Sequence, residues 1–174
     1  MMRLFIAINF DEEAKRNILT VQQRLRELGP GNFSRPENLH LTLAFLGEVA
    51  PERVVAVQSA IDLTVVRPMI LAFDHVGCFK RDGSDVWWFG LGENNLLTSL
   101  QKDLSAHLSD AGFHLESRRF LPHMTLAREV RLTVPPDRRA LLEKPFVTQV
   151  SAISLMCSDR IEGRITYAEL YQKG

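Results

Sequence analysis

Apolar residues follow two different spacings along this chain, and together they predict a mixture of strands and helices. Short continuous or alternating apolar runs, which are typical of strands, cover residues 4–8, 40–47, 69–79, 86–91, 123–129, 146–157 and 165–171. Apolar residues three and four apart predict helices over residues 11–28, from about 51 to 68, and from Asn94 or Asn95 to Gly112, with a short helix through Leu141 and Leu142. The elements lack the regular βαβ spacing of a doubly wound fold, so we expect a sheet-rich α+β protein.

The first helix has a clear apolar stripe and a local signal at its C-terminal end. Its apolar stripe consists of Ala14, Ile18, Val21, Leu25 and Leu28. The Gly-Pro pair that follows at residues 29–30 cannot continue a helix and predicts its end.

One four-residue pattern, His-x-Thr-Leu, opens a strand-like run at His40 and opens another at His123, about half the chain later. Side chains two apart on a strand point the same way, so His40 shares a face with Thr42, and His123 shares one with Thr125. The intervening leucine and methionine residues turn toward a core. Each copy therefore displays a group that titrates near neutrality beside a hydroxyl.

The surrounding elements also occur twice in the same order. A strand, a helix, a polar segment and a His-x-Thr strand fill residues 4–47, and the same series recurs between residues 86 and 129. Such an order indicates an internal duplication, which would place two equivalent strands across a shared groove. We expect residues 1–174 to form one domain with two pseudo-symmetric lobes.

Two histidines facing each other suit hydrolysis of a phosphodiester without a metal. A neutral imidazole can take a proton from water, while a protonated one can give a proton to the leaving oxygen. The hydroxyls of Thr42 and Thr125 can donate hydrogen bonds to the non-bridging oxygens. The rival explanations are a purely structural role and metal binding. A metal site usually adds a carboxylate or thiolate, and neither strand face carries one.

The remaining candidates for chemistry are weaker. The other histidines, His75 beside Asp74, His107 and His114, are predicted to be structural or on the surface. The two cysteines lack metal-binding spacing, and no glycine-rich nucleotide loop or Gly-x-Ser-x-Gly elbow occurs.

Charge and hydropathy limit the partners. The 174 residues carry 21 basic and 21 acidic side chains, so no global field attracts long polyanions, and a nucleic-acid ligand is expected to be a strand end or a nucleotide. No apolar run approaches the length of a membrane span, and the first run is a poor signal peptide. We expect a cytoplasmic monomer that does not bind membranes.

The residues around both motifs resemble the two-histidine (2H) phosphoesterase superfamily. The resemblance is to its RNA 2′,3′-cyclic phosphodiesterases, also called 2′-5′ RNA ligases, and it spans most of the chain. The matching stretches are residues 3–8 (RLFIAI), 36–48 (PENLHLTLAFLGE) and 122–128 (PHMTLAR).

The resemblance implies a bilobal fold of two mainly antiparallel sheets with flanking helices around a central groove, and neither a metal nor a cofactor. It implies hydrolysis of RNA 2′,3′-cyclic phosphate ends to 2′-phosphomonoester ends, and reversible 2′-5′ ligation. His40 would be the proton donor, His123 the proton acceptor, and Thr42 and Thr125 would hold the phosphate. Two alternatives remain open. One is a phosphodiesterase acting on free cyclic nucleotides, ADP-ribose cyclic phosphate or 2′-5′ oligonucleotides, and the other is a nucleotide-binding module without turnover.

Phe45 and Arg128 each lie five residues after a motif histidine. An aromatic ring and a guanidinium stack well on a nucleobase, so we hypothesise that these two side chains flank the terminal base. An odd spacing points them away from the histidine face on a regular strand. The hypothesis therefore requires a strand end, a twist or a bulge after residue 43 or 126. Otherwise Phe45 belongs to the core and Arg128 to the surface.

Overall fold

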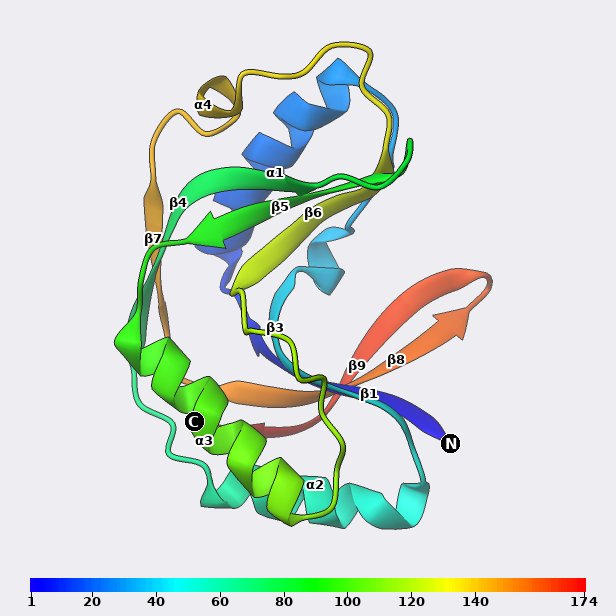
Figure 1. The fold of residues 1–174 in the computed structure, drawn as a ribbon, viewed down its shortest axis with the longest axis vertical. Helices are drawn as coiled ribbons and strands as arrows, with labels where there is room; N and C mark the ends of the chain where they lie inside the picture. The colour runs from blue at the N-terminus through cyan, green and yellow to red at the C-terminus, as the bar shows by residue number, and fades with distance from the viewer.

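The computed structural model describes residues 1–174 (Figure 1). Its strands are β1 (Met2–Asn9), β2 (Asn32–Phe33), β3 (His40–Val49), β4 (Met69–Phe79), β5 (Asp85–Leu91), β6 (His123–Val130), β7 (Phe146–Val150), β8 (Ile153–Ile161) and β9 (Arg164–Lys173). Its helices are α1 (Glu12–Leu28), α2 (Val54–Leu63), α3 (Asn95–Asp110) and α4 (Arg138–Leu141), with single 3₁₀ turns at Pro36–Asn38 and Pro51–Arg53.

The strands form two antiparallel sheets. The four-stranded sheet has the order β3-β1-β8-β9, and the five-stranded sheet has the order β2-β6-β5-β4-β7. In each sheet, the strand that carries a His-x-Thr motif pairs with the strand that precedes a long helix. Strand β3 pairs with β1, which precedes α1, and β6 pairs with β5, which precedes α3. The predicted α+β class with two antiparallel sheets and flanking helices is therefore confirmed.

The long helix of each half covers the sheet of the other half (Figure 1). Helix α1 follows β1 of the four-stranded sheet but packs on β6 and β7, whereas α3 follows β5 of the five-stranded sheet but packs on β3. The buried side chains from both sheets and from α1, α2 and α3 consequently join in one hydrophobic cluster of 36 residues. This crossover ties the two halves together and brings helix side chains to the back of the motif strands.

Capping residues begin both long helices at the predicted places. The Asp11 carboxylate accepts a hydrogen bond from the Ala14 backbone N–H at 2.8 Å, and the Asn94 side chain accepts one from the Leu97 N–H at 3.0 Å. Each side chain satisfies a donor that has no partner within its helix. Gly112, which follows α3, has a φ of +82°, a conformation that favours glycine.

Three predicted elements differ from the structure, and one observed strand was not predicted. The run 146–157 is two strands, β7 and β8, because the chain passes from one sheet to the other between them. Strand β3 continues through Gly47, which adopts a φ of +70° within the strand. Helix α2 begins later and ends earlier than predicted. The short β2 was missed because pairing with β6, rather than any apolar pattern, makes it a strand.

Candidate active site

The two His-x-Thr motifs begin strands that contact each other across the two sheets. His40 is the first residue of β3 and His123 is the first residue of β6, and these strands are neighbours although they belong to different sheets (Figure 1). In both motifs the histidine and the threonine are partly exposed, while the residues between and after them are buried. The predicted division between a polar face and a core face is therefore present in both strands.

The two imidazole rings are held by the same local hydrogen bond. Nδ1 of His40 lies 2.7 Å from the backbone oxygen of Asn38, and Nδ1 of His123 lies 2.7 Å from that of Leu121. A carbonyl oxygen only accepts, so each bond places a proton on Nδ1 and leaves Nε2 to take up or release a proton. The Nε2 atom of His40 also lies 3.1 Å from the Thr42 hydroxyl.

His40 sits in an aromatic corner of the four-stranded sheet. Its ring centroid lies 4.9 Å from that of Phe5 and 5.1 Å from that of Tyr167 on β9. Burial lowers the pKa of His40, and the nearby charges of Arg128 and His123 lower it further, while the hydrogen bond to Asn38 opposes the shift. Two of these causes, the charges of Arg128 and His123, come from the other sheet.

A β-bulge in β3 brings Phe45 to the histidine face. Ala7 of β1 pairs with Thr42, and the residue before it, Ile6, pairs with Ala44. Leu43 therefore has no partner on β1. Leu43 and Ala44 are both buried, and the alternation of the strand is reversed beyond them. Phe45 is consequently 43% exposed, with the guanidinium of Arg3 lying 5.2 Å from its ring centroid.

Strand β6 has the same bulge at the corresponding place. Trp88 of β5 pairs with Thr125 and Trp87 pairs with Ala127, which leaves Leu126 without a partner on β5. Leu126 and Ala127 are both fully buried, so Arg128 emerges on the face of His123 and Thr125. The guanidinium of Arg128 makes no hydrogen bond or ion pair within the protein. The bulge that the stacking hypothesis required is thus present in both strands.

Glutamine side chains from the crossed helices support both bulges. Gln22 of α1 is buried and donates through Nε2 to the Leu126 carbonyl at 2.8 Å and to the Ser34 carbonyl at 2.7 Å. Gln101 of α3 donates to the Leu43 carbonyl at 3.5 Å. The Leu126 carbonyl also accepts from the Ser34 backbone N–H at 3.0 Å, so Gln22 gives this carbonyl a second donor. Sequence reasoning missed Gln22, although a polar residue beside the apolar stripe of its helix was a usable signal.

Other residues noted in the sequence lie apart from this arrangement or serve as its surroundings. His107 pairs with Asp103 at 3.2 Å on α3, as a surface histidine would. Trp87 is buried, whereas Trp88 is half-buried with its ring centroid 6.0 Å from that of His123. Tyr167 was missed because its strand shows no pattern that relates it to the motifs.

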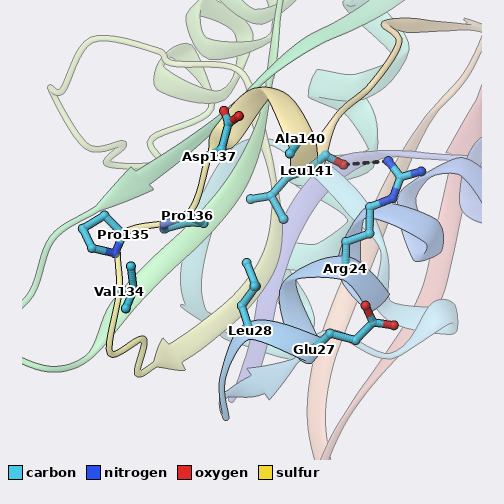
Figure 2. A pocket seen from close by; sticks show the side chains of 9 residues that line it. All are labelled: Arg24, Glu27, Leu28, Val134, Pro135, Pro136, Asp137, Ala140 and Leu141. Atoms are coloured by element: carbon cyan, nitrogen blue, oxygen red, sulfur yellow. Dashed lines mark hydrogen bonds between the residues drawn. The ribbon is translucent and has the colours of Figure 1, made fainter.

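A surface hollow elsewhere on the molecule contains none of these residues. Figure 2 shows that it lies between the end of α1 and the segment that leads into α4, with Leu28, Pro135 and Leu141 among its walls. Arg24 donates to the Leu141 carbonyl at 3.0 Å across its edge. The hollow brings together no nucleophile with a base.

Two further properties concern metals and membranes. No group of three or more His, Cys, Asp or Glu side chains is arranged to hold a metal ion. None of the helices combines the length and the apolar character that a membrane crossing requires.

Comparison with known proteins places the whole arrangement in a family. A family model described as the 2′-5′ RNA ligase superfamily matches residues 11–162. The RNA 2′,3′-cyclic phosphodiesterase of Archaeoglobus fulgidus is 32% identical over 131 residues, covering 75% of this chain and 74% of the relative. The Escherichia coli K12 protein of that name is 33% identical over 173 residues, covering 97% and 93%.

A solved structure agrees over nearly the whole fold. The crystal structure of E. coli LigT complexed with 3′-AMP matches with a TM-score of 0.83 at 27% identity, covering 99% of this chain and 97% of that one. The chain belongs to the 2′-5′ RNA ligase superfamily.

Proposed function

We propose that this protein hydrolyses RNA 2′,3′-cyclic phosphate ends to 2′-phosphomonoester ends by acid–base catalysis with two histidines. The observation that carries the proposal is the matched anchoring of His40 and His123, whose Nδ1 atoms bond to backbone carbonyls so that Nε2 is the nitrogen left for proton transfer in each ring. Relatives named RNA 2′,3′-cyclic phosphodiesterase, which align with most of the chain, support this choice of substrate.

In the proposed reaction, Nε2 of His123 takes a proton from water as the water oxygen attacks phosphorus. The bond between phosphorus and O3′ breaks, and His40 gives its proton to O3′. Thr42 and Thr125 donate hydrogen bonds to the non-bridging oxygens as charge redistributes. The anionic phosphate favours the protonated imidazole of His40 and so opposes the effect of burial on its pKa. The assignment of acid and base follows the family resemblance.

Phe45 and Arg128 are proposed to flank the terminal base. The two bulges place them on the histidine faces of their strands, and an arginine without an internal partner is free to stack or to pair with phosphate. Arg128 would add positive charge close to the reacting phosphorus, because its charge already influences His40.

The same proposal treats residues 1–174 as a single 2H phosphoesterase domain of two pseudo-symmetric lobes that works without a metal or cofactor. It includes the reverse chemistry, in which a 5′-hydroxyl replaces water and a 2′-5′ linkage forms. The name of the matching family supports this ligation. Its partners would be RNA ends or small nucleotides, and a monomeric state and a cytoplasmic location remain predictions from the sequence.

A second candidate substrate is a smaller cyclic phosphate, such as a free cyclic nucleotide, ADP-ribose cyclic phosphate or a 2′-5′ oligonucleotide. Solved structures of E. coli LigT in complex with ATP and with NADP⁺ favour keeping this alternative, because those ligands are free nucleotides.

The deciding experiment is incubation with an RNA oligonucleotide that ends in 2′,3′-cyclic phosphate, with and without a chelator. We expect a 2′-phosphate product at the same rate in both reactions, and slower hydrolysis of the small cyclic phosphates tested beside it. A 3′-phosphate product, a rate abolished by the chelator, or binding without turnover would each contradict the proposal.

A further inference from the structure

Three aromatic side chains continue from His123 across the five-stranded sheet. The centroid of Phe79 lies 5.6 Å from that of His123, and the centroid of Trp88 lies 5.1 Å from that of Phe79. The ring of His75 follows, 5.7 Å from Trp88. We call Phe79, Trp88 and His75 the aromatic shelf. All three rings are partly or fully open to solvent, so the shelf is a surface beside the motif and not part of the core.

Two glycines allow the shelf rings to lie against the sheet. Trp88 pairs with Gly77 on the neighbouring strand, and a Cβ atom at Gly77 would fall on the indole. His75 pairs with Gly90 in the same way, and a Cβ at Gly90 would fall on the imidazole. A large ring set over a glycine lies across the sheet instead of standing away from it. The face of Trp88 or His75 that is turned away from the sheet is then the one that a stacking partner would meet.

We propose that the aromatic shelf binds the base of the nucleoside that supplies the attacking 5′-hydroxyl in 2′-5′ ligation. This inference rests on the proposed function. In that reaction the 5′-hydroxyl gives its proton to Nε2 of His123, its oxygen forms the new bond to phosphorus, the bond to O3′ breaks, and O3′ receives the proton from His40. The product is a 2′-5′ phosphodiester, with no other reactant required.

The position of the shelf favours the attacking nucleoside over the terminal nucleoside of the cyclic phosphate strand. In-line displacement puts the attacking oxygen on the side of phosphorus opposite O3′, which is the side of the proton acceptor His123. A nucleoside joined to that oxygen therefore extends toward the groups that surround His123, and the shelf begins there. The terminal base of the cyclic phosphate strand is assigned to Phe45 and Arg128, on the far portions of the motif strands.

The chemistry of the shelf fits a base and not a phosphate. Two of its members are neutral aromatic rings, and the third, His75, is hydrogen-bonded to the Asp74 carboxylate at its outer edge. Aromatic side chains bind nucleobases by stacking, which is worth enough to change affinity by about tenfold or more. A strand that ends in a 5′-hydroxyl carries no phosphate at that end. Its terminal nucleoside therefore brings no extra negative charge near the Asp74 carboxylate.

The test measures ligation with two acceptors, a 5′-hydroxyl RNA and the same RNA with an abasic 5′-terminal nucleotide, each mixed with an RNA that ends in 2′,3′-cyclic phosphate. The ratio of 2′-5′ ligated to hydrolysed product is followed as the acceptor concentration rises. For the unaltered protein we expect the abasic acceptor to need about tenfold or more higher concentration for half-maximal ligation. The measurement is repeated with Trp88→Leu and Phe79→Leu, which keep apolar bulk without a ring.

We define the preference as the half-maximal concentration of the abasic acceptor divided by that of the acceptor with a base. In both variants this ratio should fall toward one. The overall rate can also change, because both rings lie near His123, but that change does not affect the ratio. The matched control is Phe45→Leu, in which that preference should persist. Equal use of both acceptors by the unaltered protein would overturn the inference, and so would a preference that survives Trp88→Leu.

The outcomes separate the two proposals. Hydrolysis of the cyclic phosphate without ligation of either acceptor would overturn the inference and leave the proposed function standing. Absence of hydrolysis would refute the proposed function itself.

Discussion

Replacing Gln22 by methionine tests whether the crossed helix supports the bulge of β6. Gln22 is 3% exposed, and its Nε2 donates to the Ser34 carbonyl at 2.7 Å and to the Leu126 carbonyl at 2.8 Å. Methionine keeps the length of the side chain but has no N–H to donate. The variant therefore removes both hydrogen bonds with little change in packing.

The two carbonyls do not lose the same amount. The Leu126 carbonyl still accepts from the Ser34 N–H at 3.0 Å, so there only the net value of one hydrogen bond is lost, about 0.5–1.5 kcal/mol. The Ser34 carbonyl, in a partly buried residue, loses the donor that Gln22 provides, which costs about 1–3 kcal/mol. We expect Gln22→Met to lower the free energy of unfolding by the sum of these losses, about 1.5–4.5 kcal/mol.

The assay is equilibrium unfolding in urea, with Gln101→Met as the matched control. Gln101 is only partly buried and its bond to the Leu43 carbonyl is long, at 3.5 Å, so its loss should cost about 1 kcal/mol or less. Gln22→Met should also raise KM for the RNA end, because the bulge it supports turns Arg128 to the strand face that we propose binds the substrate. Equal destabilisation by the two variants, or an unchanged KM in Gln22→Met, would refute the support that we assign to Gln22.

Three further predictions concern the site itself. Alanine at His40 or at His123 should each lower kcat by about 10²–10⁴-fold, measured by product formation with the folded variants, and a rate close to the original would remove that residue from the proton transfers. Burial lowers the pKa of His40 below the value of about 6.5 in the unfolded chain, so between these two pKa values the unfolded state binds more protons. The contribution of His40 to stability is thus intact above about pH 6.5 and declines as the pH falls through that window. His40→Gln should reduce this decline, measured by urea unfolding at several pH values. An unchanged decline would contradict the prediction. Phe45→Ala should raise KM for the RNA end about tenfold but change it little for an abasic cyclic phosphate, and equal effects on both would argue against stacking.

The spacing of polar and apolar residues was sufficient to predict most elements of this fold. Alternation with a period of two and stripes with a period near 3.6 depend on the backbone geometry of each segment alone. The start of α1 after Asp11 and the strand Met69–Phe79 could therefore be predicted from local sequence. The division of residues 146–157 between two sheets could not, because partner strands elsewhere in the chain decide it.

For the site, the sequence by itself determined which residues we propose for the chemistry and that each histidine shares a strand face with its threonine. Only the tertiary structure decided where Phe45 and Arg128 point, because the bulges that turn them depend on how β1 and β5 pair with the motif strands. It also decided that Tyr167 lies against His40 and that Gln22 reaches the bulge of β6. These contacts join residues more than a hundred positions apart in the chain, so the local pattern around either residue cannot predict them.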